Sequence, residues 1–136
     1  MKLVFDIAGG DFTAAGKASS RIKKVLKQLQ VDPKTIKRIV VAVYEAEVNV
    51  VAHSVGGTLT ATISGSEISV VVQDHGPGIL DIEQAMKVGF STASRKVREM
   101  GFGAGMGLPN IKKNTDDLTI ESQPGKGTML VFSILI

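Results

Sequence analysis

The sequence predicts an α/β protein, a two-layer α+β sandwich in which a mixed, mostly antiparallel sheet of about five strands carries helices on one face. β-branched residues dominate five short segments, and the turns at residues 64–66 and 124–127 are of the hairpin kind that joins antiparallel strands. Two longer segments instead repeat their apolar residues at helical spacing. With 136 residues, the chain suits a single domain spanning residues 1–136.

Composition excludes several classes of protein. The sequence has no cysteine, which rules out disulfide scaffolds, thiolate metal sites and thiol catalysis. No apolar run approaches the roughly 20 residues that cross a bilayer, and the N-terminus lacks the pattern of a signal peptide. We therefore expect a soluble, cytoplasmic protein without a membrane partner.

Positive charge is concentrated in the first third of the chain. Residues 1–40 hold nine Lys and Arg against three Asp and Glu, whereas residues 41–136 hold seven against ten. We interpret this charge as a solvated helix face and expect no nucleic-acid partner. The alternative is that the basic first third binds nucleic acid or an acidic protein. The single Tyr and the absence of Trp agree, because they leave few side chains on which bases could stack.

The N-terminal part of the sequence predicts a strand and two helices. Residues 2–7 alternate partly between polar and apolar, as a half-buried strand does. Over residues 12–29 the apolar side chains recur every three or four positions, with Lys, Arg and Gln between them, which predicts an amphipathic helix. Asp32 followed by Pro33 then signals the start of a second helix, with Asp as the cap and Pro in its first turn.

The segment 39–55 is ambiguous between strand and helix. Its residues are mostly β-branched, and Glu45, Glu47 and Asn49 alternate with apolar neighbours, which is typical of a strand. The run nevertheless continues for about seventeen residues without a turn signal, whereas strands usually end after about five or six. We therefore predict a largely buried helix over residues 34–54.

The second half of the chain predicts two hairpins on either side of a glycine-rich segment. In that segment we expect a helical turn over residues 81–88 and a short helix over residues 108–114. Runs rich in β-branched residues, bounded by turn-forming residues, predict the strands at residues 58–64, 68–74, 118–122 and 128–135.

Three polar side chains follow one another at intervals of four residues on the predicted helix 34–54: Glu45, Asn49 and His53. That spacing places them one turn apart on one side of a helix whose other positions are mostly apolar. Polar groups in an apolar setting need partners. A bound ligand or metal is one way to satisfy them, and hydrogen bonds to backbone or to water are the other. The trio by itself leaves both open.

Two glycine clusters could bring backbone close to a ligand. Asp74-His-Gly76-Pro-Gly78 follows a predicted strand, where the glycines allow close approach to a flat ligand and Asp74 can accept a hydrogen bond from an exocyclic amine. Glycine also occupies every second position over residues 101–107, just before the short helix, and could offer several backbone N–H groups to an anion. An ordinary turn and a flexible loop are the respective alternatives.

Together these clusters resemble the GHKL ATPases, the superfamily of histidine kinases, gyrase-type topoisomerases, Hsp90 and MutL-like proteins. The pattern Glu45-x-x-x-Asn49-x-x-x-His53 is similar to the N-box of the anti-sigma-factor and stressosome serine kinases. The glycine boxes of the family are similar, in the same order, to Asp74-His-Gly76-Pro-Gly78, Gly103-Ala-Gly105-Met-Gly107-Leu108 and Gly125-Lys-Gly127-Thr128. The resemblance covers nearly the whole chain.

The resemblance implies a role for each matching residue. Glu45 would be the catalytic general base that accepts the proton of the attacking hydroxyl, and Asn49 would ligate Mg²⁺ through its amide oxygen. Asp74, with Thr128 nearby, would bind the adenine of ATP. The other implied nucleotide-binding positions are His53, Gly76, Gly78, Gly103, Gly105, Gly107 and Leu108.

Two details of the implied site stay open. Glu47 is a second carboxylate close to Glu45, so that either could be the base. Residues 91–102 correspond to the lid of the family, and we assign none of its basic side chains to the phosphates; these are Arg95, Lys96 and Arg98.

The small size of the chain points, within this resemblance, to an ATP- and Mg²⁺-dependent serine-protein kinase of a bacterial partner-switching system. Its substrate would be a STAS-domain antagonist protein, and its output would reach a sigma factor or a downstream signalling protein such as a phosphatase. A homodimer is left open. The alternative is a non-catalytic anti-sigma factor in which ATP gates the sequestration of a partner.

Overall fold

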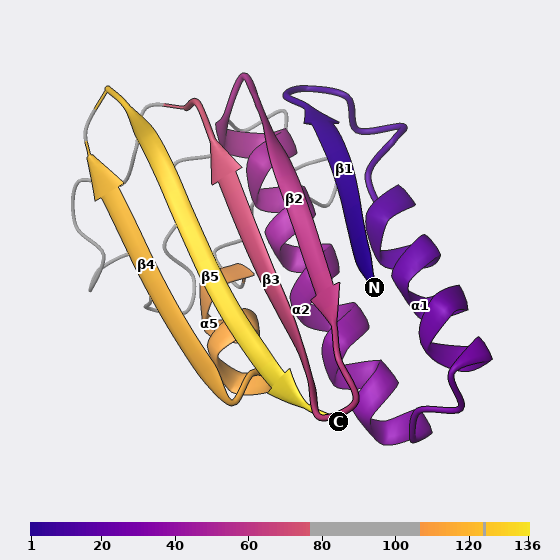
Figure 1. Cartoon of the computed structure of the whole chain (residues 1–136). Helices are drawn as coiled ribbons and strands as arrows, with labels where there is room; N and C mark the ends of the chain where they lie inside the picture. The colour runs from indigo at the N-terminus through magenta and orange to yellow at the C-terminus, as the bar shows by residue number, and fades with distance from the viewer. Residues whose placement is uncertain (77–106, 124) are drawn as a thin grey trace.

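The computed structural model describes residues 1–76, 107–123 and 125–136. Their strands form a single sheet in the order β1-β2-β3-β5-β4, and each neighbouring pair is antiparallel. The helices lie on one face of this sheet, with α2 behind its centre and α5 behind β5 and β4 (Figure 1). The elements are β1 (Lys2–Ala8), α1 (Lys17–Gln28), α2 (Pro33–His53), β2 (Gly56–Ile63), β3 (Glu67–Asp74), α5 (Gly107–Asn114), β4 (Asp117–Gln123) and β5 (Gly127–Leu135).

The predicted fold class is confirmed, with five strands and helices on one face. The described sheet is antiparallel throughout, however, and not mixed as predicted. Each strand prediction matches an observed strand to within about two residues at either end. The helical turn expected over residues 81–88 lies outside the described residues.

The first helix begins later than its apolar spacing predicts. Residues 12–16 form turns, in which the Ala14 N–H donates to the carbonyl of Asp11 and the Lys17 N–H donates to the carbonyl of Ala14. Gly16 stands at the N-cap with a φ of +101°, a left-handed conformation that a helix cannot continue through. Phe12 packs against the core although it lies in a turn. The helical spacing of apolar residues therefore begins before the helix itself does.

Helix α2 resolves the ambiguous segment in favour of a helix. Asp32 caps it by accepting hydrogen bonds from the Lys34 N–H (3.1 Å) and the Thr35 N–H (3.2 Å), and Pro33 occupies its first turn, as predicted. The helix packs against α1, α5 and the three strands β1, β2 and β3. Because neighbours cover so much of its surface, β-branched residues are tolerated around most of the helix, where their burial outweighs helix propensity.

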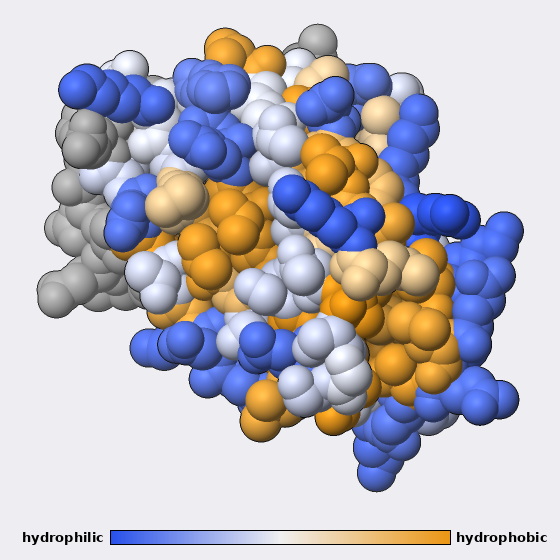
Figure 2. Space-filling model, in the orientation of Figure 1, coloured by the Kyte–Doolittle hydropathy of each residue, from blue (hydrophilic) through white to orange (hydrophobic). Residues whose placement is uncertain are grey.

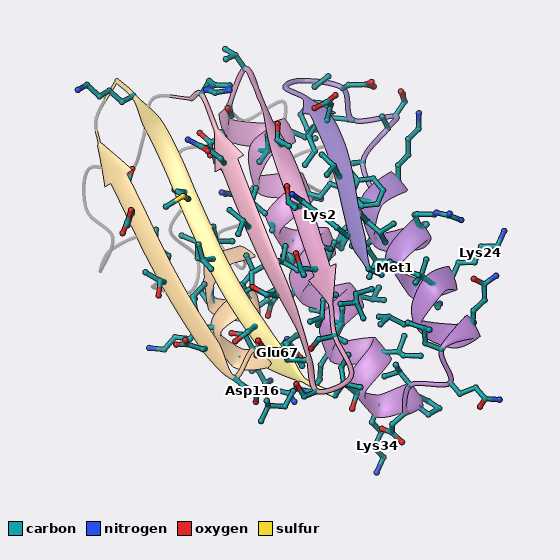
Figure 3. All side chains as sticks on the ribbon, in the orientation of Figure 1. Met1, Lys2, Lys24, Lys34, Glu67 and Asp116 are labelled. Carbon is teal, nitrogen blue, oxygen red and sulfur yellow. The ribbon has the colours of Figure 1, made fainter. Side chains whose placement is uncertain are left out.

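The core lies between the sheet and its helices. Alternate strand residues point into it, and Phe132 on β5 is the largest fully buried side chain among the described residues. Helix α1 buries Ile22 and Leu26 in the same cluster. Its basic side chains are exposed on the other side, and Figure 3 shows that of Lys24 pointing away from the protein. No described helix is both long enough and apolar enough to cross a membrane.

The other face of the sheet is partly solvated. Val4, Thr60, Val71, Val131 and Thr119 occupy one row across the five strands of this face. Polar residues flank the row, and the surface shows apolar groups separated by polar ones (Figure 2). This pattern is typical of an antiparallel sheet that packs helices on one side only.

Asp116, labelled in Figure 3, lies just before β4 and contacts both α2 and β5. Its carboxylate accepts a hydrogen bond from the Leu135 backbone N–H at 2.7 Å, and it also forms a salt bridge of 3.0 Å with the Arg38 guanidinium. The bond from Leu135, followed by the bond from Arg38, holds the pKa of Asp116 below its ordinary value.

Replacing Asp116 by Asn should therefore lower stability in a pH-dependent way. Because the pKa of Asp116 is depressed in the folded state, its contribution to the free energy of unfolding is fully present above the unfolded value, near 3.8, and is lost as the pH falls through the folded value. Urea midpoints of the parent and of Asp116→Asn should differ at neutral pH and converge in acid. Asp117→Asn is the control, and a difference that stays constant into acid would contradict the explanation.

Candidate functional site

Glu45, Asn49 and His53 lie along one side of α2, and all three are half-buried. Successive members of the trio are one helical turn apart, which corresponds to a rise of about 6 Å. No hydrogen bond joins the Asn49 amide to another described residue. The structure therefore brings the three predicted side chains into a line and leaves the Asn49 amide available to a ligand.

The carboxylate of Glu45 faces the first turns of α5. Its Oε1 accepts a hydrogen bond from Asn110 Nδ2 at 3.3 Å. Gly107, the first residue of α5, lies on the side of the other oxygen, since a Cβ built on it would stand 3.6 Å from Oε2. The carboxylate of α2 and the start of the short helix thus form one local arrangement.

Glu47 has a different environment from that of Glu45. Its side chain is only 3% exposed, and its two oxygens accept hydrogen bonds from the backbone N–H groups of Ala18 (3.1 Å) and Ser19 (3.4 Å). These donors belong to the first turn of α1, whose N-cap, Gly16, provides no capping side chain. Glu47 therefore caps α1 from a neighbouring helix. Since both of its oxygens are occupied inside the core, Glu45 is the better candidate for a base.

Asp74 ends β3 with a buried carboxylate that is 9% exposed. Its Oδ1 accepts hydrogen bonds from the Gly76 N–H at 2.9 Å and from the Thr128 N–H at 3.3 Å. No described residue donates to Oδ2. The hydroxyl of Thr128 lies 3.1 Å from that of Ser122. One oxygen of Asp74 is thus fixed by the protein, while the other can accept a hydrogen bond from a ligand.

Glycines allow the neighbouring strands to approach Asp74 closely. A Cβ at Gly127 on β5 would lie 2.2 Å from the carbonyl oxygen of Asp74, and one at Gly57 on β2 would lie 2.9 Å from its Cα. Gly76 lies against the end of α2, where a Cβ would stand 2.9 Å from Ser54 Oγ. Only glycine fits these positions without displacing backbone or the helix end. The end of β3, the end of α2 and the start of β5 therefore meet at Asp74.

Part of the predicted site lies outside the described residues, namely Gly78, Gly103 and Gly105. The unassigned basic residues Arg95, Lys96 and Arg98 lie outside them as well. Gly107 and Leu108 are described as the first two residues of α5. The Leu108 side chain is 7% exposed and belongs to the core. Contact of Leu108 with a nucleotide would therefore have to come from its backbone.

The described residues of α2 offer one amide oxygen suited to a metal that is shared with a ligand. Among the described residues, no group of three or more His, Asp or Glu side chains could hold a metal ion. The half-buried amide of Asn49 offers one oxygen, and Mg²⁺ prefers oxygen ligands while keeping several waters or phosphate oxygens. The residues present thus fit a magnesium ion that arrives with a phosphate-bearing ligand.

Sequence reasoning did not identify two polar partners of this site. Asn110 was placed on the short helix without a role, although an amide in the first turn after a glycine box is a signal that could have been noted. Ser122, beside Thr128, gave no signal, because its relevance depends on the pairing of Ser122 with Thr128 between β4 and β5.

The sequence matches the family model of the histidine kinase-like ATPase domain over residues 11–134. An anti-sigma F factor of Thermoanaerobacter sp. (strain X514) is 40% identical over 108 residues, which cover 74% of this chain and 72% of that protein. The serine/threonine-protein kinase RsbT of Bacillus subtilis (strain 168) is 30% identical over 122 residues, which cover 87% of this chain and 84% of that protein.

Solved structures with the same fold have lower sequence identity. The RsbU and RsbW domains of Rv1364c from Mycobacterium tuberculosis match with a TM-score of 0.66 at 18% identity, over 99% of this chain and 32% of that one. This chain thus spans about a third of the Mycobacterium chain. The SiaB–SiaC complex from Pseudomonas aeruginosa matches with a TM-score of 0.61 at 12% identity, over 98% of this chain and 89% of that one. At these identities the likeness shows the fold alone.

Replacing Glu47 by Ala should destabilise the protein by about 1–3 kcal/mol, because two buried backbone N–H groups of α1 would lose their acceptors. Glu47→Gln keeps one carbonyl oxygen and should lose less. Urea unfolding measures the free energies, with the exposed Glu121→Ala as the control. If Glu47→Ala proved as stable as the parent, the capping role would be wrong.

A methyl group at Gly127 should be far more damaging than one at Gly125. Both glycines have positive φ angles, +108° and +77°, so alanine is strained at either position. Only Gly127 also meets backbone, at Asp74, whereas nothing lies within 4 Å of a Cβ at Gly125. We expect Gly127→Ala to lose about 1–3 kcal/mol more than Gly125→Ala in urea unfolding. Equal losses would show that the close approach to Asp74 is unimportant.

Proposed function

Because the chain belongs to the histidine kinase-like ATPase family, we propose that it is an ATP-dependent serine-protein kinase of a bacterial partner-switching system. The observation that carries the proposal is the pair Glu45 and Asn49, half-buried and one turn apart on α2, beside the start of α5. A carboxylate and an amide at that spacing supply a proton acceptor and a magnesium ligand within reach of one phosphate group.

ATP would be held at the end of β3. Asp74 Oδ2 would accept a hydrogen bond from the adenine amino group, while Oδ1 stays bonded to the Gly76 and Thr128 N–H groups. The phosphates would extend toward Asn49 and Gly107. The resemblance to the family's N-box and glycine boxes supports nucleotide contacts at further positions, namely His53, Gly78, Gly103, Gly105 and the backbone of Leu108.

Asn49 would hold Mg²⁺ through its amide oxygen, together with phosphate oxygens and water. When bound, the ion supplies positive charge against the phosphate oxygens. The start of α5 would add backbone N–H groups and the positive end of the helix dipole at the same place. These contacts position the γ-phosphoryl group and offset its charge, which is most of what phosphoryl transfer requires.

Glu45 would accept the proton of the attacking seryl hydroxyl. Its position one turn before Asn49 supports this role, because the base must lie beside the phosphate without displacing the metal. Glu47 is unsuited to the role, since the backbone of α1 occupies both of its oxygens. The basic side chains over residues 91–102 remain unassigned.

Two of the relatives support the proposed activity and output, because one is named a serine/threonine-protein kinase and the other an anti-sigma F factor. We propose a cytoplasmic, single-domain protein whose substrate is a STAS-domain antagonist and whose output reaches a sigma factor or a downstream phosphatase. The alternative is an anti-sigma factor that binds ATP and sequesters its partner without transferring phosphate.

Glu45→Gln distinguishes these two functions. The substitution keeps the size and the hydrogen-bonding oxygen of the side chain but removes its basicity, so that transfer of labelled phosphate from ATP to a STAS-domain protein should fall by a factor of about 10²–10⁴. Binding of Mg–ATP, followed as a rise in the melting temperature, should be nearly unchanged.

The matched control is Glu47→Gln, which should transfer phosphate at a rate close to that of the parent. If the parent binds ATP and a partner but transfers no phosphate, the sequestering function is correct. If ATP with magnesium does not raise the melting temperature of the parent, both functions are wrong.

A further inference from the structure

Asn110 is the one side chain among the described residues that hydrogen-bonds the carboxylate of Glu45. Its amide nitrogen lies 3.3 Å from Oε1, and the contact is half-buried. The two residues are 65 positions apart in the sequence and come from different helices, α2 and α5.

The contact makes the two oxygens of Glu45 unequal. Oε1 accepts a hydrogen bond from the Asn110 amide. Oε2 lies on the side of Gly107, because a Cβ built on that glycine would be 3.6 Å from Oε2, an ordinary contact distance. A glutamate has three rotatable bonds, and an unrestrained carboxylate would sample several orientations. A single donor on Oε1 limits that freedom and leaves Oε2 to face the start of α5.

Asn110 is itself held in place by the packing of α5. Leu108 and Ile111, on either side of it in the sequence, are buried at 7% and 0% exposure. The backbone carbonyl of Asn110 accepts a hydrogen bond from Asn114 Nδ2 at 2.8 Å. The helix that presents the amide is therefore fixed, and the same helix begins at Gly107, where the phosphates are proposed to lie.

We propose that Asn110 is a positioning residue for Glu45, an inference that rests on the proposed function. Its amide holds Oε1, so that Oε2 receives the proton. In the step, the seryl O–H bond breaks and its proton goes to Oε2. The seryl oxygen forms a bond to the γ-phosphorus, and the bond from that phosphorus to the bridging oxygen breaks, with its electron pair leaving on ADP. In this role Asn110 acts through Glu45 and not by contact with ATP or the protein substrate.

The test separates the rate of phosphate transfer from the affinity for ATP. Asn110→Leu replaces the amide by an apolar group of similar size, and Asn110→Ala removes it without adding bulk. Lys113→Ala is the matched control, because it changes an exposed side chain on the same helix and leaves the contact between Asn110 and Glu45 intact. Single-turnover transfer of labelled phosphate is measured with purified STAS-domain proteins of the same genome, and the Kd of Mg–ATP is measured by titration.

Both Asn110 variants should transfer phosphate at least about tenfold more slowly than the parent, since small misplacements of a reacting group are costly. Their Kd for Mg–ATP should stay within about twofold, and Lys113→Ala should behave as the parent. Unchanged transfer in the Asn110 variants, or a joint loss of transfer and ATP affinity, would overturn the positioning role of Asn110 but leave the proposed function standing. A parent that binds Mg–ATP but transfers no phosphate would overturn the proposed function, and this role with it.

Discussion

The position of α2 against the sheet is the constraint on which the rest of the structure depends. One helix has to close the core and also present the polar side chains of the site, and three polar contacts fix it. Glu47 joins it to the first turn of α1, Arg38 joins it to Asp116 before β4, and Glu45 meets Asn110 of α5. Because these contacts reach different parts of the chain, the helix can neither turn about its axis nor slide without breaking at least one of them.

The two carboxylates Glu45 and Glu47 show how environment divides similar residues between roles. They are two positions apart and therefore point to different sides of the helix. The side that carries Glu47 is covered by α1, and the Glu47 carboxylate caps that helix inside the core. The side of Glu45 meets a half-buried amide and a glycine, which leaves one of its oxygens free of described donors. A proton acceptor needs such an oxygen.

Much of the fold could be predicted because its signals are local. The cap formed by Asp32 and Pro33, the two hairpins and the line of polar residues along α2 all depend on neighbours in the sequence. The start of α1 was predicted too early, because Phe12 continues the apolar period while packing from a turn. The partners of Glu47 and Glu45 could not be predicted, since Ser19 and Asn110 are 28 and 65 positions away from them. Such contacts depend on how the helices pack.

A crystal structure of the chain with a non-hydrolysable ATP analogue and magnesium tests the central claim most directly. We expect the adenine amino group to lie within hydrogen-bond distance of Asp74 Oδ2 and the metal to be bound by the Asn49 amide oxygen. A nucleotide bound at another surface, or a metal without Asn49 among its ligands, would contradict this account of the site.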